Sequence, residues 1–479
     1  MKFTLTALLI LVIALIALGL LYGYPDMLQL LPQGSHLWRQ ADSYAMTQNY
    51  HQYGLPFLQP ETYNLQSTQG KVAGEFPLFY FIAAQCKNTA LALRVLHTGT
   101  FFSGIIAIYF ISFYFLQRRF LSVLCTLFMC TSPLLIFYGN NFLSDVPALS
   151  MALVGWAFFL YAYQKEQLWW LSLGFCCFTL AGLLKASELI NLAMLTVFLF
   201  QQRNKKSTFK WSIMWLAISS ILIFIWYAYA KQYNREQHDT YYFLSVSPVW
   251  KLTAYEIGLG LWRMLISWSK NYFWQPSSFL LLIAAFYMLR HRKKLDAELR
   301  VVIASGMLFT ILYILLFYQK MIGHEYYYVP FFIFILFAMI GILKTYNFFN
   351  TENVFTHTAL FIFLLLNIFF CKSFVSQKLT DNLYNGNMAS VEMQQFLTQH
   401  GVSEKSIVLS LPDDSPNKTL SLLKRKGYTE FNEYPIVLRQ KQADFLVVGN
   451  DQWKQRILLQ PYLKDSIGNF HGITLYKLK

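Results

Sequence analysis

Charged residues are scarce in this chain of 479 residues: Asp, Glu, Lys and Arg make up 13% of it, against about 25% in ordinary soluble domains. A water-soluble globular protein is therefore excluded, because its surface would need more charge. Hydrophobic residues make up 56% of the chain, and the mean hydropathy is +0.38. This composition predicts a protein that crosses a membrane several times.

Cysteine is also rare, and the polar C-terminal part has none. The six cysteines show no disulfide or zinc spacing, and we expect buried structural thiols. They all lie in or beside apolar stretches: Cys86, Cys125, Cys130, Cys176, Cys177 and Cys371.

Several chemical motifs are missing. The C-terminal part has no Gly-rich phosphate loop and no nucleophile elbow, and the chain has no Asp-x-Asp motif. We therefore expect no cofactor and no metal site, with a divalent cation left open.

The net charge of +15 could suggest a nucleic-acid partner. However, most Lys and Arg residues lie in short loops between apolar stretches or in the C-terminal part. Anionic membrane lipids and the positive-inside rule explain this distribution, and we expect membrane lipids, not nucleic acid, as partners.

About eleven apolar stretches have the length and composition of membrane spans. The first is better explained as an uncleaved span than as a signal peptide, because its apolar run is long. A shorter apolar stretch, 76–86, is expected to form a re-entrant or interfacial helix. The spans are 3–22, 96–116, 120–138, 142–163, 168–184, 186–201, 211–230, 276–289, 301–318, 327–343 and 355–371.

Basic residues predict the orientation of these spans. With the N-terminus inside, the cytoplasmic loops hold about thirteen Lys and Arg residues, whereas the opposite short turns hold only Lys185 and Lys320. The long loops 23–95 and 231–275 and the tail after Lys372 then face outward. The thirteen are Arg118, Arg119, Lys165, Arg203, Lys205, Lys206, Lys210, Arg290, Arg292, Lys293, Lys294, Arg300 and Lys344.

The C-terminal part, 372–479, alternates short apolar runs with helix-like stretches. The runs SIVLSL, ADFLVVG and ITLYKL predict strands, and VEMQQFLTQH and KTLSLLKRKG predict helices between them. We therefore predict a mainly α, polytopic membrane domain, 1–371, followed by a small α/β domain with an accessory or acceptor-positioning role.

The loop 23–95 is too long for a simple connector and too aromatic for a disordered segment. Its part from His36 to Leu78 contains two acids, Asp42 and Glu75, and we expect it to fold into an active-site loop. In the loop 231–275, the stretch SPVWKLTAYEIGLGLWRMLISW predicts an amphipathic helix on the membrane surface or a partial span.

Polar residues from distant parts of the sequence are expected on the outer side. Ionisable groups at the boundary of apolar spans are costly and are often functional. Carboxylates there could orient or deprotonate a hydroxyl, and cations could hold a phosphate leaving group, as a reaction on a lipid-linked phosphosugar requires. The candidates are Arg39, Asp42, Lys71, Glu75, Asp145, Lys185, Glu188, His324, Glu325 and Tyr327.

Each candidate also has a purely structural explanation. An acid can cap a helix, as Asp42 would for a helix from Ser43 and Asp145 for the fourth span. Glu75 can pair with a nearby Arg, and Lys185 can extend to the membrane interface. His324 can be an interfacial histidine, and Tyr326, Tyr327 and Tyr328 can form an aromatic belt.

The layout of one span, a long outer loop with an early acid, many spans and an outer domain resembles that of GT-C glycosyltransferases. Local motifs resemble glycosyltransferase family 39, the bacterial relatives of protein O-mannosyltransferases, and the lipid A aminoarabinose transferases. The resemblance covers about residues 1–371 and rests on Trp38-Arg39-Gln40-Ala41-Asp42, Glu75-Phe76-Pro77-Leu78, Asp145-Val146-Pro147, Lys185, and His324-Glu325-Tyr326-Tyr327 followed by Pro330.

The resemblance implies a role for each matching residue. Asp42 corresponds to the catalytic acid-base residue of the first loop and Asp145 to a second acid, while Lys185 and His324 correspond to phosphate ligands. Aminoarabinose-type relatives often carry Gly-Lys-Pro-Pro where this chain has Gly-Glu-Phe-Pro. This departure assigns Glu75 to sugar or acceptor hydroxyls and leaves Arg39 or Lys71 to supply positive charge.

The sequence thus predicts an inverting, integral-membrane glycosyltransferase that takes a sugar from a polyprenyl phosphate on the outer side of a bacterial inner membrane. The acceptor could be a glycan, a lipid or a protein. A transporter or lipid flippase is the alternative, although we find no inverted repeats and the candidates cluster at one end of the spans. A non-catalytic assembly protein is a third possibility.

Overall fold

The computed structural model describes residues 5–201, 206–242, 245–346, 354–431, 441–450 and 466–478. Arg203 and Lys205, two of the basic residues in the expected cytoplasmic loops, lie outside these ranges. The chain divides into two compact units. Unit 1 consists of Met1–Leu28, Val95–Trp226 and Ser245–Lys378, and unit 2 of Gln29–Arg94, Tyr227–Leu244 and Leu379–Lys479.

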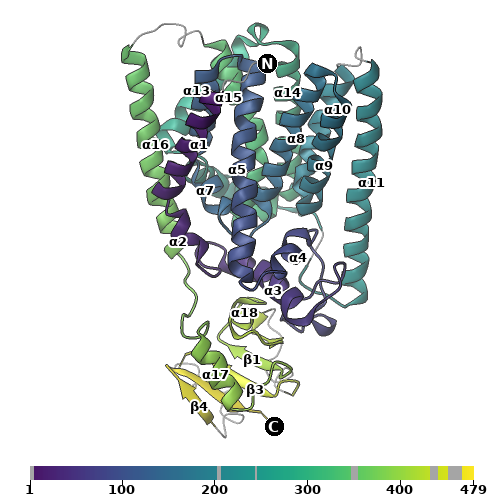
Figure 1. The fold of residues 1–479 in the computed structure, drawn as a ribbon, viewed down its shortest axis with the longest axis vertical. Coiled ribbons are helices and arrows are strands. Elements are labelled where there is room, and N and C mark those ends of the chain that lie inside the picture. The colour runs from purple at the N-terminus through teal and green to yellow at the C-terminus, as the bar shows by residue number, and fades with distance from the viewer. Residues whose placement is uncertain are drawn as a thin grey trace. The chain divides into compact units, whose positions relative to one another are not determined.

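Unit 1 is helical, and its long helices run roughly alongside one another (Figure 1). Helix α8 packs against α9, α10 against α14, and α14 against α15. The helices that lie wholly or mainly in this unit are α1 (Leu5–Leu21), α2 (Tyr24–Leu28), α5 (Thr89–Leu116), α6 (Arg119–Met129), α7 (Pro133–Gly139), α8 (Asp145–Lys165), α9 (Leu168–Leu184), η2 (Ala186–Glu188), α10 (Leu189–Gln201), α11 (Lys206–Glu236), η3 (Val249–Lys251), α12 (Ala254–Asn271), α13 (Gln275–Arg290), η4 (Arg292–Lys294), α14 (Ala297–Gly323), η5 (Glu325–Phe331), α15 (Phe332–Thr345) and α16 (Val354–Thr380).

Each predicted span overlaps one or two of these helices, so the prediction of a multi-pass membrane protein is confirmed. Among the described residues, six helices are long and apolar enough to cross a membrane, or up to eight if each bent pair is one span. Three shorter apolar helices, Thr6–Leu21, Leu168–Leu184 and Ala186–Gln201, account for further predicted spans. The count of eleven stays a prediction.

At two breaks between helices, a proline lies in the first turn of the second helix. Helices α6 and α7 meet at 73°, and Pro133 stands in the first turn of α7. Helices α12 and α13 meet at 106°, with Pro276 in the first turn of α13. Proline lacks the N–H that would continue the preceding helix but fits a first turn well. Helix α12 is the amphipathic helix expected in the loop 231–275, and a capping box at Thr253 and Glu256 starts it.

The thiols follow the expectation only in part. Cys125, Cys130 and Cys371 are buried, whereas Cys86 and Cys176 are exposed, so the prediction of burial is wrong for those two. Cys176 lies on the apolar helix α9, where a membrane span exposes side chains to lipid and not to a protein core.

Unit 2 combines the outer-loop residues with the C-terminal α/β part. Its elements are α3 (Leu37–Tyr53), η1 (Thr68–Gly70), α4 (Leu78–Ala84), α17 (Val391–Gln399), α18 (Lys418–Leu423), β1 (Val408–Leu411), β2 (Gly427–Tyr428), β3 (Phe445–Val448), β4 (Ser466–Phe470) and β5 (Ile473–Lys477). Both helices and all three strands expected in the tail are present, so this prediction is confirmed. The sequence missed β2, which has two residues, and β4, whose sequence SIGNF lacks apolar alternation.

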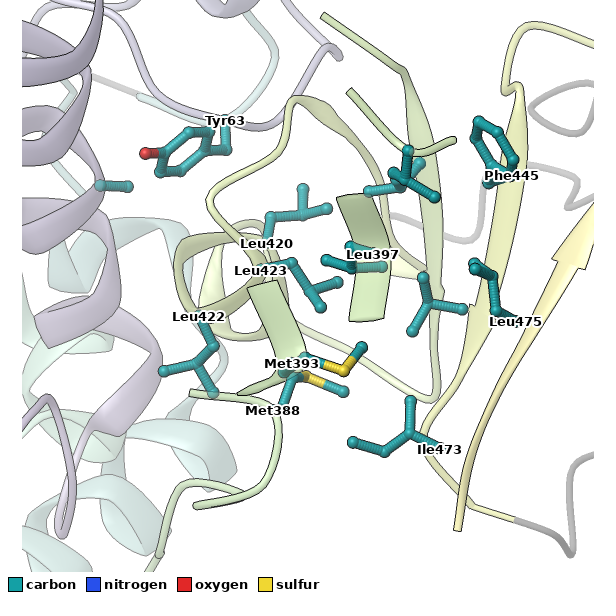
Figure 2. Packing of buried hydrophobic residues seen from close by; sticks show 14 residues of the cluster. Tyr63, Met388, Met393, Leu397, Leu420, Leu422, Leu423, Phe445, Ile473 and Leu475 are labelled. Carbon is teal, nitrogen blue, oxygen red and sulfur yellow. The ribbon is translucent and has the colours of Figure 1, made fainter. Parts of the chain in front are cut away.

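The sheet has the strand order β2-β1-β3-β5-β4. Strand β1 pairs in parallel with β2 and β3, Val408 lying opposite Gly427 and Phe445, while β5 runs antiparallel to β3 and β4. A hydrophobic cluster joins this sheet to the outer-loop residues. Figure 2 shows Tyr63 of the loop in the same cluster as Leu420 and Leu423 of α18 and Leu475 of β5.

Candidate functional site

Helix α3 places Asp42 in the interior of unit 2. The helix starts at Leu37, so Asp42 lies within it and the alternative of a capping role at Ser43 is wrong. The side chain is 0% exposed. An acid is rarely buried so completely without partners, because removing a charge from water is costly.

Three side chains from separate parts of the chain meet this carboxylate. Tyr241 Oη donates a hydrogen bond of 2.6 Å to Asp42 Oδ2, and Asn417 Nδ2 donates one of 2.9 Å to Oδ1. Arg39 Nη1 lies 3.6 Å from Oδ2, one turn back along α3. Among the described residues each oxygen of Asp42 accepts one hydrogen bond, and since a carboxylate oxygen can accept more than one, Asp42 can accept a further hydrogen bond.

Arg39 also binds Glu75. Its Nη2 donates to Glu75 Oε1, and its guanidinium carbon lies 5.8 Å from the centre of the Tyr242 ring. One guanidinium therefore serves two carboxylates, and the proposed pairing of Glu75 with a nearby Arg is present. Lys71 is not among the partners of Arg39 or Asp42 in the described part of the chain; it forms a β-bridge with Glu61.

Aromatic rings surround the Tyr241 hydroxyl that reaches Asp42. The Tyr241 ring packs edge-on against Phe431 at 4.9 Å and against Trp38 at 6.4 Å between ring centres. The carboxylate of Asp239 accepts from the backbone N–H groups of Tyr241 (3.2 Å) and Tyr242 (2.7 Å). This local turn fixes where the two tyrosines point.

Burial raises the pKa of Asp42 from 3.8 to about 6, although Arg39 and the hydrogen bonds from Tyr241 and Asn417 act in the opposite direction. Burial also raises the pKa of Tyr241 well above its usual value, with the neighbouring carboxylate adding to the effect. Tyr241 therefore keeps its proton near pH 7 and donates it in the hydrogen bond. Asp42 is mostly ionised at pH 7 but binds a proton more readily than an ordinary aspartate.

Unit 1 contains a second acidic site, where helix ends meet. Asp145 is the first residue of α8 and is 3% exposed; Ser144, not Asp145, precedes the helix. Lys185, just after the end of α9, lies with Nζ at 3.1 and 3.2 Å from the two oxygens of Asp145. The same ammonium group lies 5.6 Å from the ring centre of Tyr326 and 6.0 Å from that of Tyr327, within the range of cation–π contacts.

Glu325 forms another ion pair in this unit. Its Oε1 accepts hydrogen bonds from Lys378 Nζ at 2.6 Å and from Tyr138 Oη at 3.0 Å. His324 stacks on Tyr326 with ring centres 5.5 Å apart. The expected motif around Glu325 thus supplies aromatic rings and one acid, and helix α16 supplies a lysine to neutralise it.

Glu188 lies deeper in unit 1 and is 1% exposed. Its Oε2 accepts from Asn191 at 2.7 Å, and Asn191 in turn accepts from the indole N–H of Trp156 at 3.0 Å. This polar chain links η2, α10 and α8, while Glu188 Oε1 is buried with no hydrogen-bond partner among the described residues.

The structure brings the expected residues together in two groups. Arg39, Asp42 and Glu75 meet in unit 2, and Asp145, Lys185, Tyr327 and their neighbours meet in unit 1. Sequence analysis missed Tyr241, Asn417 and Lys378. Tyr241 could have been suspected from its place in the aromatic loop 231–275, but no pattern distinguished Asn417 or Lys378 from other polar residues.

Within the described residues, no three His, Cys, Asp or Glu side chains gather as the ligands of a metal ion would. The absence of a metal cofactor stays a prediction.

The fold is similar to that of solved membrane transferases. ArnT from Cupriavidus metallidurans bound to undecaprenyl phosphate superposes with a TM-score of 0.62 at 10% identity, over 98% of each chain. The archaeal oligosaccharyltransferase AglB from Archaeoglobus fulgidus, in complex with an inhibitory peptide and a dolichol-phosphate, gives 0.54 at 9% identity over 93% of this chain and 69% of that one. The chain has the GT-C fold.

The arabinofuranosyltransferase AftD from Mycobacteria, also of this GT-C fold, gives a TM-score of 0.58 at 12% identity, covering 98% of this chain and 40% of that one. No protein-family profile matches the chain, and no curated protein sequence matches it. The GT-C prediction is confirmed, while the finer assignment to family 39 stays a prediction.

Proposed function

We propose that this protein is a glycosyltransferase that transfers a sugar from a polyprenyl-phosphate donor to an acceptor hydroxyl, with inversion at the anomeric carbon. The observation that carries the proposal is Asp42: a fully buried carboxylate with two hydrogen-bond donors, a guanidinium and a pKa of about 6. Perturbed, specifically partnered acids of this kind are candidates for catalytic roles. The GT-C neighbours that bind undecaprenyl phosphate and dolichol-phosphate support the choice of donor class.

In the proposed reaction, Asp42 accepts a hydrogen bond from the acceptor hydroxyl and takes its proton. The acceptor oxygen forms a bond to the anomeric carbon while the bond from that carbon to the phosphate oxygen breaks. A base is most effective when its pKa lies near the working pH. Tyr241 and Asn417 each hold one oxygen of Asp42, so the remaining lone pairs point in fixed directions.

The phosphate group that leaves is already a good leaving group and needs positive charge more than a proton. Within unit 2 we assign this charge to Arg39, which lies 3.6 Å from Asp42. Within unit 1, Lys185 and His324 stay predicted phosphate ligands, and Glu325 and Tyr327 stay predicted sugar contacts. The pairing of Lys185 with Asp145 and two aromatic rings keeps its ammonium group in place before the phosphate binds. Electrostatic stabilisation of this kind often contributes most to such a reaction.

Orientation and domain roles belong to the same proposal. The charge bias of about thirteen to two supports an orientation in which the loop 23–95 and the tail 372–479 face the outer side of a bacterial inner membrane, with 1–371 as the membrane domain. Glu75 would serve sugar or acceptor hydroxyls, since its partner Arg39 is shared with Asp42.

The test uses the purified full-length protein in lipid nanodiscs with a panel of polyprenyl-phosphate sugars and candidate glycan, lipid and protein acceptors. Release of free polyprenyl phosphate together with a glycosylated product, lost in Asp42→Asn, is the expected result. Equal turnover by Asp42→Asn would refute the role of Asp42. Translocation of a labelled donor across vesicles without sugar transfer would favour a flippase instead.

A further inference from the structure

The loop between β1 and α18 reaches the buried carboxylate from the C-terminal α/β part. Strand β1 is central in the parallel part of the sheet, between β2 and β3. After Leu411 the chain turns towards α18 and β2, while β3 lies on the other side of β1. Ligands of α/β sheets commonly bind at such a point, beyond the carboxyl ends of the strands.

Asp413 holds this loop in one conformation. Its side chain is 1% exposed and accepts four hydrogen bonds, from the backbone N–H and hydroxyl of Ser415 and from those of Thr419. The distances are 2.9 and 2.7 Å for Ser415 and 2.7 and 2.6 Å for Thr419. Asn417, in the middle of this span, is therefore carried on a fixed backbone.

The orientation of the Asn417 amide follows from its partners. The backbone N–H of Asn64 lies 3.1 Å from Asn417 Oδ1, and an N–H can only donate. The amide oxygen must face Asn64, so Nδ2 is left to donate to Asp42 at 2.9 Å. Asn417 is 1% exposed, and neither partner can be replaced by water without opening the unit.

The outer loop and the C-terminal part are joined around this contact. Asn64 Nδ2 donates to Pro416 O at 2.8 Å, Gly427 N donates to Tyr63 O at 2.9 Å, and Leu65 N donates to Gly427 O at 2.9 Å. Tyr63 is also a member of the hydrophobic cluster shown in Figure 2. The position of Asn417 relative to the loop is thus set by main-chain hydrogen bonds and by packing.

We propose that Asn417 is a positioning residue for Asp42, and that the C-terminal α/β part thereby completes the catalytic site. This inference rests on the proposed function. Asn417 acts through Asp42: it fixes one oxygen of the carboxylate and favours the ionised form, which must accept the proton of the acceptor hydroxyl.

The other charged and titratable groups around Asp42 come from three elements. Arg39 on α3 and Tyr241 after α11 contact it directly, while Glu75 and Tyr242 act on it through space. The effect of Asn417 must be separated from theirs. A neutral substitution of Asn417, with these groups unchanged, achieves this separation.

The test compares Asn417→Ala with the wild type. Alanine removes the donor to Asp42 without placing a second charge beside it. We expect kcat at pH 7 to fall about 10-fold or more, with the acidic limb of the kcat–pH profile moved up by about one unit. KM for the donor lipid should stay unchanged. Asn469→Ala, which removes a hydrogen bond of 2.8 Å to Thr474 in the β4–β5 hairpin, is the matched control.

Failure of this inference differs from failure of the proposed function. If the wild type consumes no polyprenyl-phosphate sugar, the proposed function is overturned. If the wild type is active, Asp42→Asn is inactive and folded Asn417→Ala keeps the wild-type kcat and pH limb, the role of Asn417 is overturned. Should Asn417→Ala not fold, Asn417→Ser carries the same test, because it is also neutral and lacks the Nδ2 group that donates to Asp42.

Discussion

Asp42 in unit 2 and Asp145 in unit 1 are both buried acids beside a cation, but different kinds of structure hold them. The partners of Asp42 come from a helix, a turn and a loop, and two of the three are neutral donors. Asp145 is the first residue of helix α8, and both of its carboxylate oxygens contact the ammonium group of Lys185. Neutral donors leave an acid able to exchange a proton, whereas a close ion pair in apolar surroundings fixes its charge.

The same contrast appears in the cationic side chains. In unit 1, Lys378 pairs with Glu325 and Lys185 with Asp145, while the guanidinium of Arg39 in unit 2 is shared between Asp42 and Glu75. We therefore expect unit 1 to respond to mutation mainly in stability and anion binding, and unit 2 mainly in catalysis.

The largest effect is expected from Asp42→Asn. Loss of the base should lower the sugar-transfer rate by about 10³-fold, measured with the active donor in nanodiscs. The thermal unfolding midpoint should not fall, because the substitution removes a buried charge. Asp414→Asn, whose side chain is 94% exposed in the same unit, should leave the rate unchanged. A large loss of the sugar-transfer rate in both Asp42→Asn and Asp414→Asn would contradict a specific role of Asp42.

Lys378→Met should chiefly destabilise unit 1. The substitution removes the ammonium group that pairs with Glu325. Loss of one partner of a buried pair costs roughly 3 kcal/mol, measured by equilibrium unfolding in mixed micelles. Lys344→Met is the control, because its pair with Asp296 is more exposed, with the lysine at 27% and the acid at 57%, and should contribute less than about 1 kcal/mol. Equal losses of stability would show that the Lys378–Glu325 pair is no more important than a surface pair.

Tyr241→Phe removes one neutral donor and keeps the ring. We expect kcat to fall about 10-fold, since a hydrogen bond to a charged group is lost, and the acidic limb of the pH profile to move upward. Tyr229→Phe, which removes a hydrogen bond of 2.6 Å to Leu58 O elsewhere in unit 2, is the control. A fall in donor affinity without a pH shift would mean that Tyr241 serves binding instead.

The smallest effect concerns pH in the wild type. Activity should halve near pH 6 as Asp42 becomes protonated.

The folded protein binds this proton more tightly than the unfolded chain, so the contribution of Asp42 to stability falls as pH rises from 3.8 to about 6. The gain in melting temperature of Asp42→Asn over the wild type should therefore be larger at pH 7 than at pH 4. A gain independent of pH would contradict the raised pKa.

Sequence alone determined the class of fold. Long apolar runs such as that of α14 can only be helices in a membrane, because every backbone group must be satisfied within the segment. Alternation of short apolar runs with helical stretches was enough to predict β1, β3 and β5 in the tail. The sequence also identified Asp42 and Asp145 as candidates, because acids next to apolar spans are costly.

Only the tertiary structure decided which residues meet. Asp42 and Asn417 are 375 positions apart, and Asp42 and Tyr241 are 199 apart. A hydrogen bond between such distant residues leaves no periodic trace in the sequence, because it depends on how whole elements pack and not on local propensity. For the same reason, the neighbouring sequence could not predict that the guanidinium of Arg39 is shared between Asp42 and Glu75.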